Sequence, residues 1–171
     1  PDLDVDAFAT YLALNNLLVN ADSLVGMGNN YYLYWDDSIE RFTLLMWDAN
    51  ESMGKLGMGN ISTDYDIYYA SASSNRMPMM GGTNVLFTRF MATPTFKALY
   101  EEKLTQIYQA AFTSGALQAQ IAEYVDVVRP AIEARGLASL DAYDSAVSSI
   151  QKFVTLRGEY LAGTELLGEN P

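Results

Sequence analysis

The sequence contains neither cysteine nor histidine among its 171 residues. Without these residue types the protein cannot build a zinc site from thiolates and imidazoles, a thiol nucleophile, or a serine–histidine–aspartate triad. A general base must therefore be an aspartate, a glutamate, a lysine or a tyrosine. The lack of cysteine leaves the redox compartment undetermined.

Basic residues are also scarce, with 10 Lys and Arg against 21 Asp and Glu, for a net charge of −11. Nucleic-acid polymers and anionic membrane surfaces both require clusters of basic side chains, so we expect neither as a partner. The sequence has no apolar run of transmembrane length, and we expect no membrane insertion. ATP remains a candidate ligand, because a divalent cation can bridge carboxylates to phosphates.

Half of the residues are hydrophobic, which is enough for a sizeable core. We expect a single domain over residues 1–171, of class α+β and mostly helical. Residues 1–48 are predicted to form a helix followed by a β-hairpin, residues 49–82 a long loop, and residues 83–171 a helical bundle. Gly and Ser recur in the long loop without clear periodicity, and a loop of this length is typical either of a functional segment or of an irregular surface loop.

Helix boundaries are marked by capping residues. Asp4 or Asp6 can cap the first helix, which should end near Asn20. In the bundle, Pro94 is expected at the first position of a helix, and Pro130 should kink or divide a later one. Further helix boundaries are expected at Ser114, Gly115, Gly136 and Ser139. The last helix should fray at Gly163 and Gly168.

Two strands are predicted at residues 31–35 and 42–47, which are rich in aromatic and branched side chains. The second strand is apolar on both faces, so we expect it to be buried. Tyr31, Tyr32 and Tyr34 alternate along the first strand, which predicts that at least one of its faces lies in the core. The alternative is an exposed platform on which a sugar or a base could stack.

Polar residues flank this hairpin. Asp22 precedes a glycine-containing loop that ends in Asn29 and Asn30, and Asp48 follows the second strand. Carboxylate and amide oxygens gathered at one end of a hairpin form a hard-oxygen site suited to Mg²⁺ and a phosphate-bearing ligand. The alternatives are ordinary ones: Asp22 caps local backbone, the two asparagines are turn residues, and Asp48 is a solvated carboxylate at a strand end.

The order of these residues matches the one used in protein kinases, where a catalytic Asp, an Asn ligand and a metal-binding Asp follow one another along the chain. The interval from Asp22 to Asn29 or Asn30 is seven or eight residues, longer than in a kinase catalytic loop. The match therefore lies in the order of these residues along the chain and in their position around a hairpin, and not in their exact spacing.

The run N-x-D-S, G-N-N-Y-Y-L-Y, R-F-T-L-L-M-W-D-A-N resembles the CotH family, the spore coat protein H-like atypical protein kinases. Downstream, N-V-L-F-T-R-F-M-A-T-P-T-F-K-A-L-Y and S-S-I-Q-K-F-V-T-L-R-G-E-Y-L are similar to the helical segments of that family. The resemblance spans most of the chain.

The resemblance implies a protein-kinase-like fold whose hairpin carries the active-site acids. It implies transfer of the ATP γ-phosphate to Ser or Thr of a Ser/Thr-rich coat or surface protein, with Mg²⁺ or Mn²⁺, at an extracellular, cell-surface or spore-coat location. Asp22 would be the catalytic base and Asp48 a metal ligand. Asn30 would bind metal or phosphate, and Asn29 is a second candidate for that position.

The sequence departs from the family pattern in places. Met46 stands where the family usually has Pro, and Asn50 where it often has a second Asp, which bears on a second metal site. The nucleotide-binding Lys segment of the family normally lies upstream, and Lys55 is no substitute for it. We therefore expect this chain to be the C-terminal portion of such a kinase domain, and its activity in isolation stays open.

Two other functions remain open at this point. The same fold could serve as a non-catalytic module for coat assembly or adhesion, because fold does not guarantee activity. The same carboxylates could also support a metal-dependent phosphate hydrolase that needs no acceptor protein.

Overall fold

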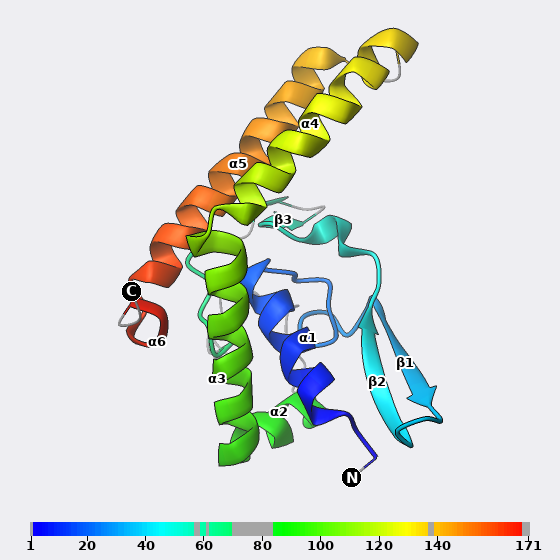
Figure 1. Cartoon of the computed structure of the whole chain (residues 1–171), viewed down its shortest axis with the longest axis vertical. Helices are drawn as coiled ribbons and strands as arrows, with labels where there is room; N and C mark the ends of the chain where they lie inside the picture. The colour runs from blue at the N-terminus through cyan, green and yellow to red at the C-terminus, as the bar shows by residue number, and fades with distance from the viewer. Residues whose placement is uncertain (1, 57–58, 61, 70–83, 137–138, 169–171) are drawn as a thin grey trace. The chain divides into compact units, whose positions relative to one another are not determined.

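The computed structural model describes residues 2–56, 59–60, 62–69, 84–136 and 139–168 (Figure 1). The chain forms two compact units, Pro1–Ile107 and Tyr108–Pro171. The described residues are mostly helical with two-stranded antiparallel sheets, in agreement with the expected α+β class. A single domain over the whole chain stays a prediction.

The first unit begins with α1, Val5–Leu17. Asp4 is its N-cap, as predicted, and its side chain accepts a hydrogen bond from the Ala7 N–H at 3.1 Å. The helix ends three residues before the expected Asn20, because Val19 is left-handed with φ 50°. The Val19 and Asn20 N–H groups donate to the carbonyls of Asn16 and Asn15, which is the pattern of a Schellman cap. A β-branched residue is strained in this conformation, and Val19 is held there in a buried position.

The core of the first unit forms around α1, which is buried on most of its circumference. Phe8 meets Phe90 edge to face with ring centroids 5.0 Å apart, so α1 packs on α2, Val85–Ala92. Asn84 caps α2 by accepting from the Phe87 N–H, and α3, Pro94–Tyr108, starts at the predicted proline. The fully or nearly fully buried apolar side chains of this unit include Phe8, Leu12, Leu17, Phe90, Tyr100 and Leu104.

The predicted hairpin is present. Strand β1, Tyr31–Asp36, pairs antiparallel with β2, Arg41–Met46, in a register that runs from Tyr31 opposite Met46 to Asp36 opposite Arg41. On the far side of β2, the backbone of Phe42 exchanges hydrogen bonds with Asp2 and Asp4, so the segment before α1 adds a short parallel bridge.

The expectation that the hairpin is buried is wrong. Only Leu44 is buried, on the strand that contacts α1, whereas Tyr31, Tyr32 and Tyr34 are 38%, 53% and 54% exposed. The physical reason is that the sheet has two strands, and within the described residues α1 covers it only around Leu44. Neither face of β1 belongs to the core, which leaves the exposed-platform alternative in place.

The segment after the hairpin is more ordered than a structureless loop in its described part. It contains a 3₁₀ turn, η1, Ala49–Glu51, and the short strands β3, Lys55–Leu56, and β4, Gly59–Asn60. The Tyr69 hydroxyl donates to the Leu12 carbonyl at 2.7 Å and the Asn16 amide donates to the Asp66 carbonyl at 3.0 Å. Residues 62–69 are therefore fixed to α1, while residues 70–82 of the expected loop lie outside the described residues.

The second unit consists of helices. A π-helical turn, Gln109–Thr113, leads into α4, Ala116–Arg135, which continues through Pro130 without being divided there. Gly136 ends α4 in a left-handed conformation and Ser139 caps α5, Leu140–Ala162, both as predicted. After Gly163 the chain forms α6, Glu165–Gly168, where a fraying end was expected.

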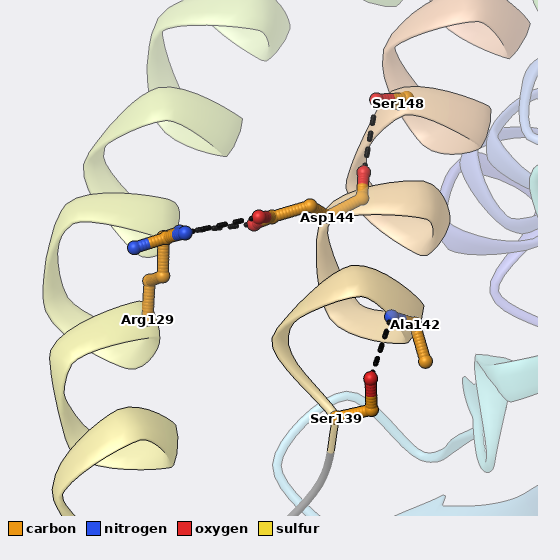
Figure 2. A network of polar contacts seen from close by, with 5 residues as sticks. All are labelled: Arg129, Ser139, Ala142, Asp144 and Ser148. Carbon is orange, nitrogen blue, oxygen red and sulfur yellow. Dashed lines mark hydrogen bonds and ion pairs between the residues drawn. The ribbon is translucent and has the colours of Figure 1, made fainter.

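Polar contacts hold α4 and α5 together as an antiparallel pair. Gln118 near the start of α4 donates to the Gln151 carbonyl, and Arg129 further along α4 forms a two-pronged ion pair with Asp144 near the start of α5 (Figure 2). None of the helices in the described ranges is both long and apolar enough to cross a bilayer.

Candidate functional site

The candidate site lies in the first unit, in the turn-rich segment that joins α1 to β1. Hydrogen bonds through two asparagine side chains connect this segment to α1. The Asn15 amide donates to the Tyr11 carbonyl at 2.7 Å, and the Asn20 amide donates to the Asn15 side-chain oxygen at 2.9 Å. The Asn20 oxygen then accepts from the Asp22 N–H at 3.2 Å. Asn15 and Asn20 are buried, so this relay fixes the backbone of Asp22 relative to α1.

Tyr11 and Ser23 hold the other side of this segment. The buried Tyr11 hydroxyl accepts from the Leu24 N–H at 3.1 Å, and burial raises the pKa of Tyr11, which keeps the hydroxyl neutral. The Ser23 carbonyl accepts from the Gly28 N–H at 2.9 Å. At Gly26 a Cβ would lie 1.7 Å from the Ala21 carbonyl oxygen, so only glycine fits this close turn.

The carboxylate of Asp22 is bound by both predicted asparagines. The Asn29 amide donates to Oδ1 at 2.9 Å and the Asn30 amide donates to Oδ2 at 2.7 Å. Both carboxylate oxygens thus receive side-chain donors, in place of the local backbone contact that the ordinary alternative required. The half-buried Asp22 side chain is held in one orientation at the end of the hairpin.

Asp48 is connected to this group through the backbone. The Trp47 N–H donates to the Asn30 carbonyl at 3.1 Å, which extends the hairpin ladder by one pair beyond Tyr31 and Met46. Asp48 follows directly, exposed and left-handed with φ 43°. Strained conformations of this kind at non-glycine residues cluster at functional sites. The structure therefore brings Asp22, Asn29 and Asn30 into contact. It places Asp48 one residue after Trp47, whose backbone is hydrogen-bonded to Asn30.

Glu51 is a further acidic residue at this end of the hairpin that the sequence reasoning did not single out. It lies at the end of η1, three residues after Asp48, and its Oε2 atom is buried without a hydrogen-bond partner among the described residues. In the sequence, the feature that could have indicated Glu51 is its position as an acidic residue three positions after Asp48.

The residues at this site fit a divalent cation of the Mg²⁺ type. The described part of the chain has no group of three or more His, Cys, Asp or Glu side chains that could hold a metal alone. Mg²⁺ does not need one, because it is usually held by one or two carboxylates together with substrate phosphates and water. Asp48, an exposed carboxylate whose side chain makes no capping hydrogen bond, is a ligand of that kind.

An apolar surface adjoins the site. Side chains of Tyr32, Tyr34 and Leu45 share one face of the hairpin by register, and Trp47 extends it next to Asp48; we call these four residues the aromatic face. Trp47 and Tyr32 meet edge to face with centroids 5.2 Å apart, and they are 57% and 53% exposed. Exposed aromatic rings beside a carboxylate can bind a planar ring by stacking.

Comparison with known protein families gives the class. The family model described as CotH kinase protein matches residues 2–161, which is most of the chain. The chain belongs to this family, whose members are kinase-like proteins related to the spore coat. No curated protein matches the chain significantly. The resemblance noted in the hairpin and in the later helices is thereby confirmed.

Proposed function

We propose that this chain supplies the catalytic and metal-binding residues of an atypical protein kinase, which transfers the γ-phosphate of ATP to a Ser or Thr hydroxyl. The observation that carries the proposal is the double amide contact on Asp22, with Asn30 bonded through its carbonyl to the residue before Asp48. Membership of the CotH kinase family supports the same reaction class. The proposed acceptor is a Ser/Thr-rich coat or surface protein, at an extracellular or spore-coat location.

In this proposal Asp22 is the general base. The hydroxyl oxygen of the acceptor forms a bond to the γ-phosphorus as the bond to the ADP oxygen breaks, and the hydroxyl proton passes to the Asp22 carboxylate. Asn29 and Asn30 hold that carboxylate so that it need not reorient during the reaction.

Asp48 and the side-chain oxygen of Asn30 would hold Mg²⁺ or Mn²⁺. Because the nitrogen branch of the Asn30 amide faces Asp22, its oxygen branch is turned away from that carboxylate and can accept a cation. A bound ion would neutralise part of the charge on the phosphate oxygens.

The aromatic face is proposed to bind the adenine ring of the nucleotide. Trp47 adjoins the metal-binding Asp48, so a base stacked on Trp47 and Tyr32 would direct its phosphates toward the candidate site. Stacking of a base on an aromatic side chain contributes about 1–3 kcal/mol.

The test uses the full-length gene product and labelled ATP, with Mg²⁺ or Mn²⁺, and measures transfer to the protein itself and to a Ser-rich acceptor. Asp22→Asn is expected to lower kcat by about a hundredfold or more while nucleotide binding persists. Asp48→Asn is expected to abolish metal-dependent nucleotide binding. Asp126→Asn, at an exposed position of α4, serves as the matched control and should behave as the parent protein.

The same experiment separates the competing functions. Phosphate release that continues without an acceptor at full rate would assign a metal-dependent hydrolase. Absence of both transfer and metal-dependent nucleotide binding would assign a non-catalytic coat or adhesion module, for which Asn50 in place of a second Asp leaves room. Retained transfer in Asp48→Asn would contradict the proposed metal ligand.

A further inference from the structure

Strand β1 has one edge to which no other strand of the described ranges is hydrogen-bonded. It pairs with β2 along one side only, and the sheet has the order β1-β2. Helix α1 contacts β2, and Figure 1 shows β1 on the outer side of the hairpin. On the free side of β1 the backbone groups therefore have no partner within the described part of the chain.

The register of the hairpin identifies the backbone groups at this edge. Phe42 exchanges hydrogen bonds with the segment before α1, so its N–H and C=O point away from β1. Phe42 lies opposite Trp35, and hydrogen-bonded and non-hydrogen-bonded pairs alternate along an antiparallel ladder. The N–H and C=O groups of Tyr31, Leu33 and Trp35 therefore point away from β2, and we call these groups the outer edge. The bond from the Trp47 N–H, beyond the other end of the ladder, agrees with this alternation.

The outer edge lacks the features that usually protect an exposed strand. Natural proteins protect such edges with charged side chains, proline, bulges or a covering segment. Residues 31–35 contain no charge and no proline, and their register with β2 is continuous. Their side chains are between 38% and 54% exposed. Because a two-stranded sheet is only marginally stable by itself, these observations favour a further strand at this edge.

A second copy of the same strand fits the outer edge in register. When two copies of β1 pair antiparallel about a two-fold axis at Leu33, each Leu33 faces its own equivalent and Tyr31 faces Trp35. These are the three residues with outward backbone groups, so each can donate to its counterpart and accept from it. Tyr32 then faces Tyr34, so aromatic side chains lie opposite one another, a pairing that stabilises sheets.

Charge does not oppose this pairing, and the register has no equal. Asp36 is the only charged residue of β1, and it faces the uncharged Asn30 of the second copy. Like charges directly opposite one another, which would be destabilising, do not occur. A two-fold axis at Tyr31 or at Trp35 would place Leu33 opposite a residue outside the strand, so only the axis at Leu33 pairs the whole outer edge.

We propose that the outer edge of β1 is a dimerisation surface, at which two copies of this chain form a continuous antiparallel sheet of order β2-β1-β1-β2. The two-fold axis is perpendicular to this sheet, so the aromatic faces of the two copies lie on the same side of it. Because Asp36 faces Asn30 of the second copy, the hairpin tip of one copy lies beside the candidate site of the other. The dimer requires neither nucleotide nor metal.

The first test is disulfide cross-linking of the full-length gene product at Leu33. In the proposed pairing the two Leu33 Cα atoms lie about 5.5 Å apart. A disulfide bridges Cα atoms at about 4.4–6.8 Å, so Leu33→Cys should form a covalent dimer with oxidised glutathione. Leu45→Cys is the matched control, because Leu45 is a similarly exposed leucine (46% against 54%) but lies on β2, away from the two-fold axis. It should remain monomeric on a denaturing gel, as the parent does.

A second test addresses the backbone hydrogen bonds. Leu33→Pro removes the outward N–H and leaves the β1–β2 ladder intact, because Leu33 and Leu44 form a non-hydrogen-bonded pair. The variant is expected to raise the dimer dissociation constant in sedimentation velocity by about tenfold or more, since each copy loses a bond. Leu33→Ala keeps the N–H and should raise this constant less than Leu33→Pro does. Circular dichroism checks that both variants are folded.

Three results would overturn the proposal. The first is a parent protein that sediments as a monomer at every concentration, which would assign the outer edge to another segment of the same protein or to a different partner. The second is cross-linking of Leu33→Cys that does not exceed that of Leu45→Cys. The third is an unchanged dimer dissociation constant in folded Leu33→Pro, which would place the interface elsewhere. None of these results bears on phosphate transfer, which is measured separately.

Discussion

The side-chain amide of Asn30 donates a hydrogen bond to the Asp22 carboxylate at 2.7 Å, while the backbone carbonyl of Asn30 accepts from Trp47. Asn30 is left-handed with φ 50°, a conformation that asparagine tolerates better than most residues. One residue therefore fixes the proposed base and the strand end that carries Asp48. The loop before the hairpin and the residue after it are joined at this point.

Replacement of Asn30 by alanine is expected to lower kcat by about ten- to a hundredfold, because Asp22 loses its shorter amide contact and the metal loses an oxygen. Asn29→Ala is the matched control: Asn29 is exposed, its contact is longer at 2.9 Å, and its removal should change kcat by about threefold or less. The measurement is steady-state phosphate transfer at saturating ATP. An equal loss of kcat in both variants would mean that Asn30 contributes no more to catalysis than Asn29 does.

The two tryptophans of the chain allow a matched test of the aromatic face. Trp47→Ala should raise the KM for ATP by about five- to a hundredfold through loss of stacking. Trp35→Ala removes the same side chain near the hairpin tip, where its ring meets Phe42 and its N–H meets Asp37, and should leave KM unchanged. Quenching of Trp fluorescence by ADP, retained in Trp35→Ala and lost in Trp47→Ala, is the direct readout. Retained quenching in Trp47→Ala would place the base elsewhere.

The buried amide relay predicts a stability effect. Asn20→Ala leaves the Asn15 oxygen and the Asp22 N–H without their partners, which should reduce the free energy of unfolding by about 1–3 kcal/mol. Asn50→Ala, at an exposed position, should change it by less than about 0.5 kcal/mol. Urea denaturation monitored by circular dichroism measures both. An unchanged free energy of unfolding in Asn20→Ala would show that water replaces the hydrogen bonds of the Asn20 side chain.

The Arg129–Asp144 pair predicts a pH dependence in the second unit (Figure 2). The hydrogen bond from Arg129 lowers the pKa of Asp144, so the pair stabilises the folded state above the ordinary aspartate pKa. That contribution is lost as the pH falls through the lowered value, below about pH 4. Asp144→Asn should therefore melt slightly lower than the parent at pH 7, and this difference should shrink as the pH falls below the ordinary aspartate range. The difference at pH 7 should shrink in 1 M NaCl, because the pair is exposed to solvent.

The control for this pair is Asp126→Asn, an exposed aspartate of α4. It should show no comparable dependence on pH. A melting temperature of Asp144→Asn that equals the parent value at pH 7 in low salt would contradict a stabilising role for the pair.

Local signals in the sequence predicted the parts of the fold that local chemistry controls. Asp4 and Ser139 cap helices, Pro94 starts one and Gly136 ends one, because each of these positions is satisfied by contacts within a few residues. The strands of the hairpin were predicted to within one residue for the same reason. The contact of Asp22 with Asn29 and Asn30 also spans few residues, and the sequence grouped these three as a candidate site.

The early end of α1 could not be predicted in this way. Val19 is left-handed although its branched side chain disfavours that conformation, and its buried position in the tertiary structure holds it there. The attachment of residues 62–69 to α1 could not be predicted either, because the composition around them shows no periodic pattern. Their hydrogen bonds go to Leu12, Asn16 and Tyr100, which are far away in the sequence.

The sequence by itself determined the types and order of the main helices and of the hairpin, the exclusion of cysteine and histidine chemistry, and the membership of the CotH kinase family. Those properties depend on composition, on spacing and on contacts between near neighbours. Only the tertiary structure decided that the aromatic hairpin is exposed and that an oxygen of Glu51 is buried without a partner among the described residues. Burial depends on which distant segments cover a surface, and an apolar strand has the same sequence pattern whether or not anything packs on it.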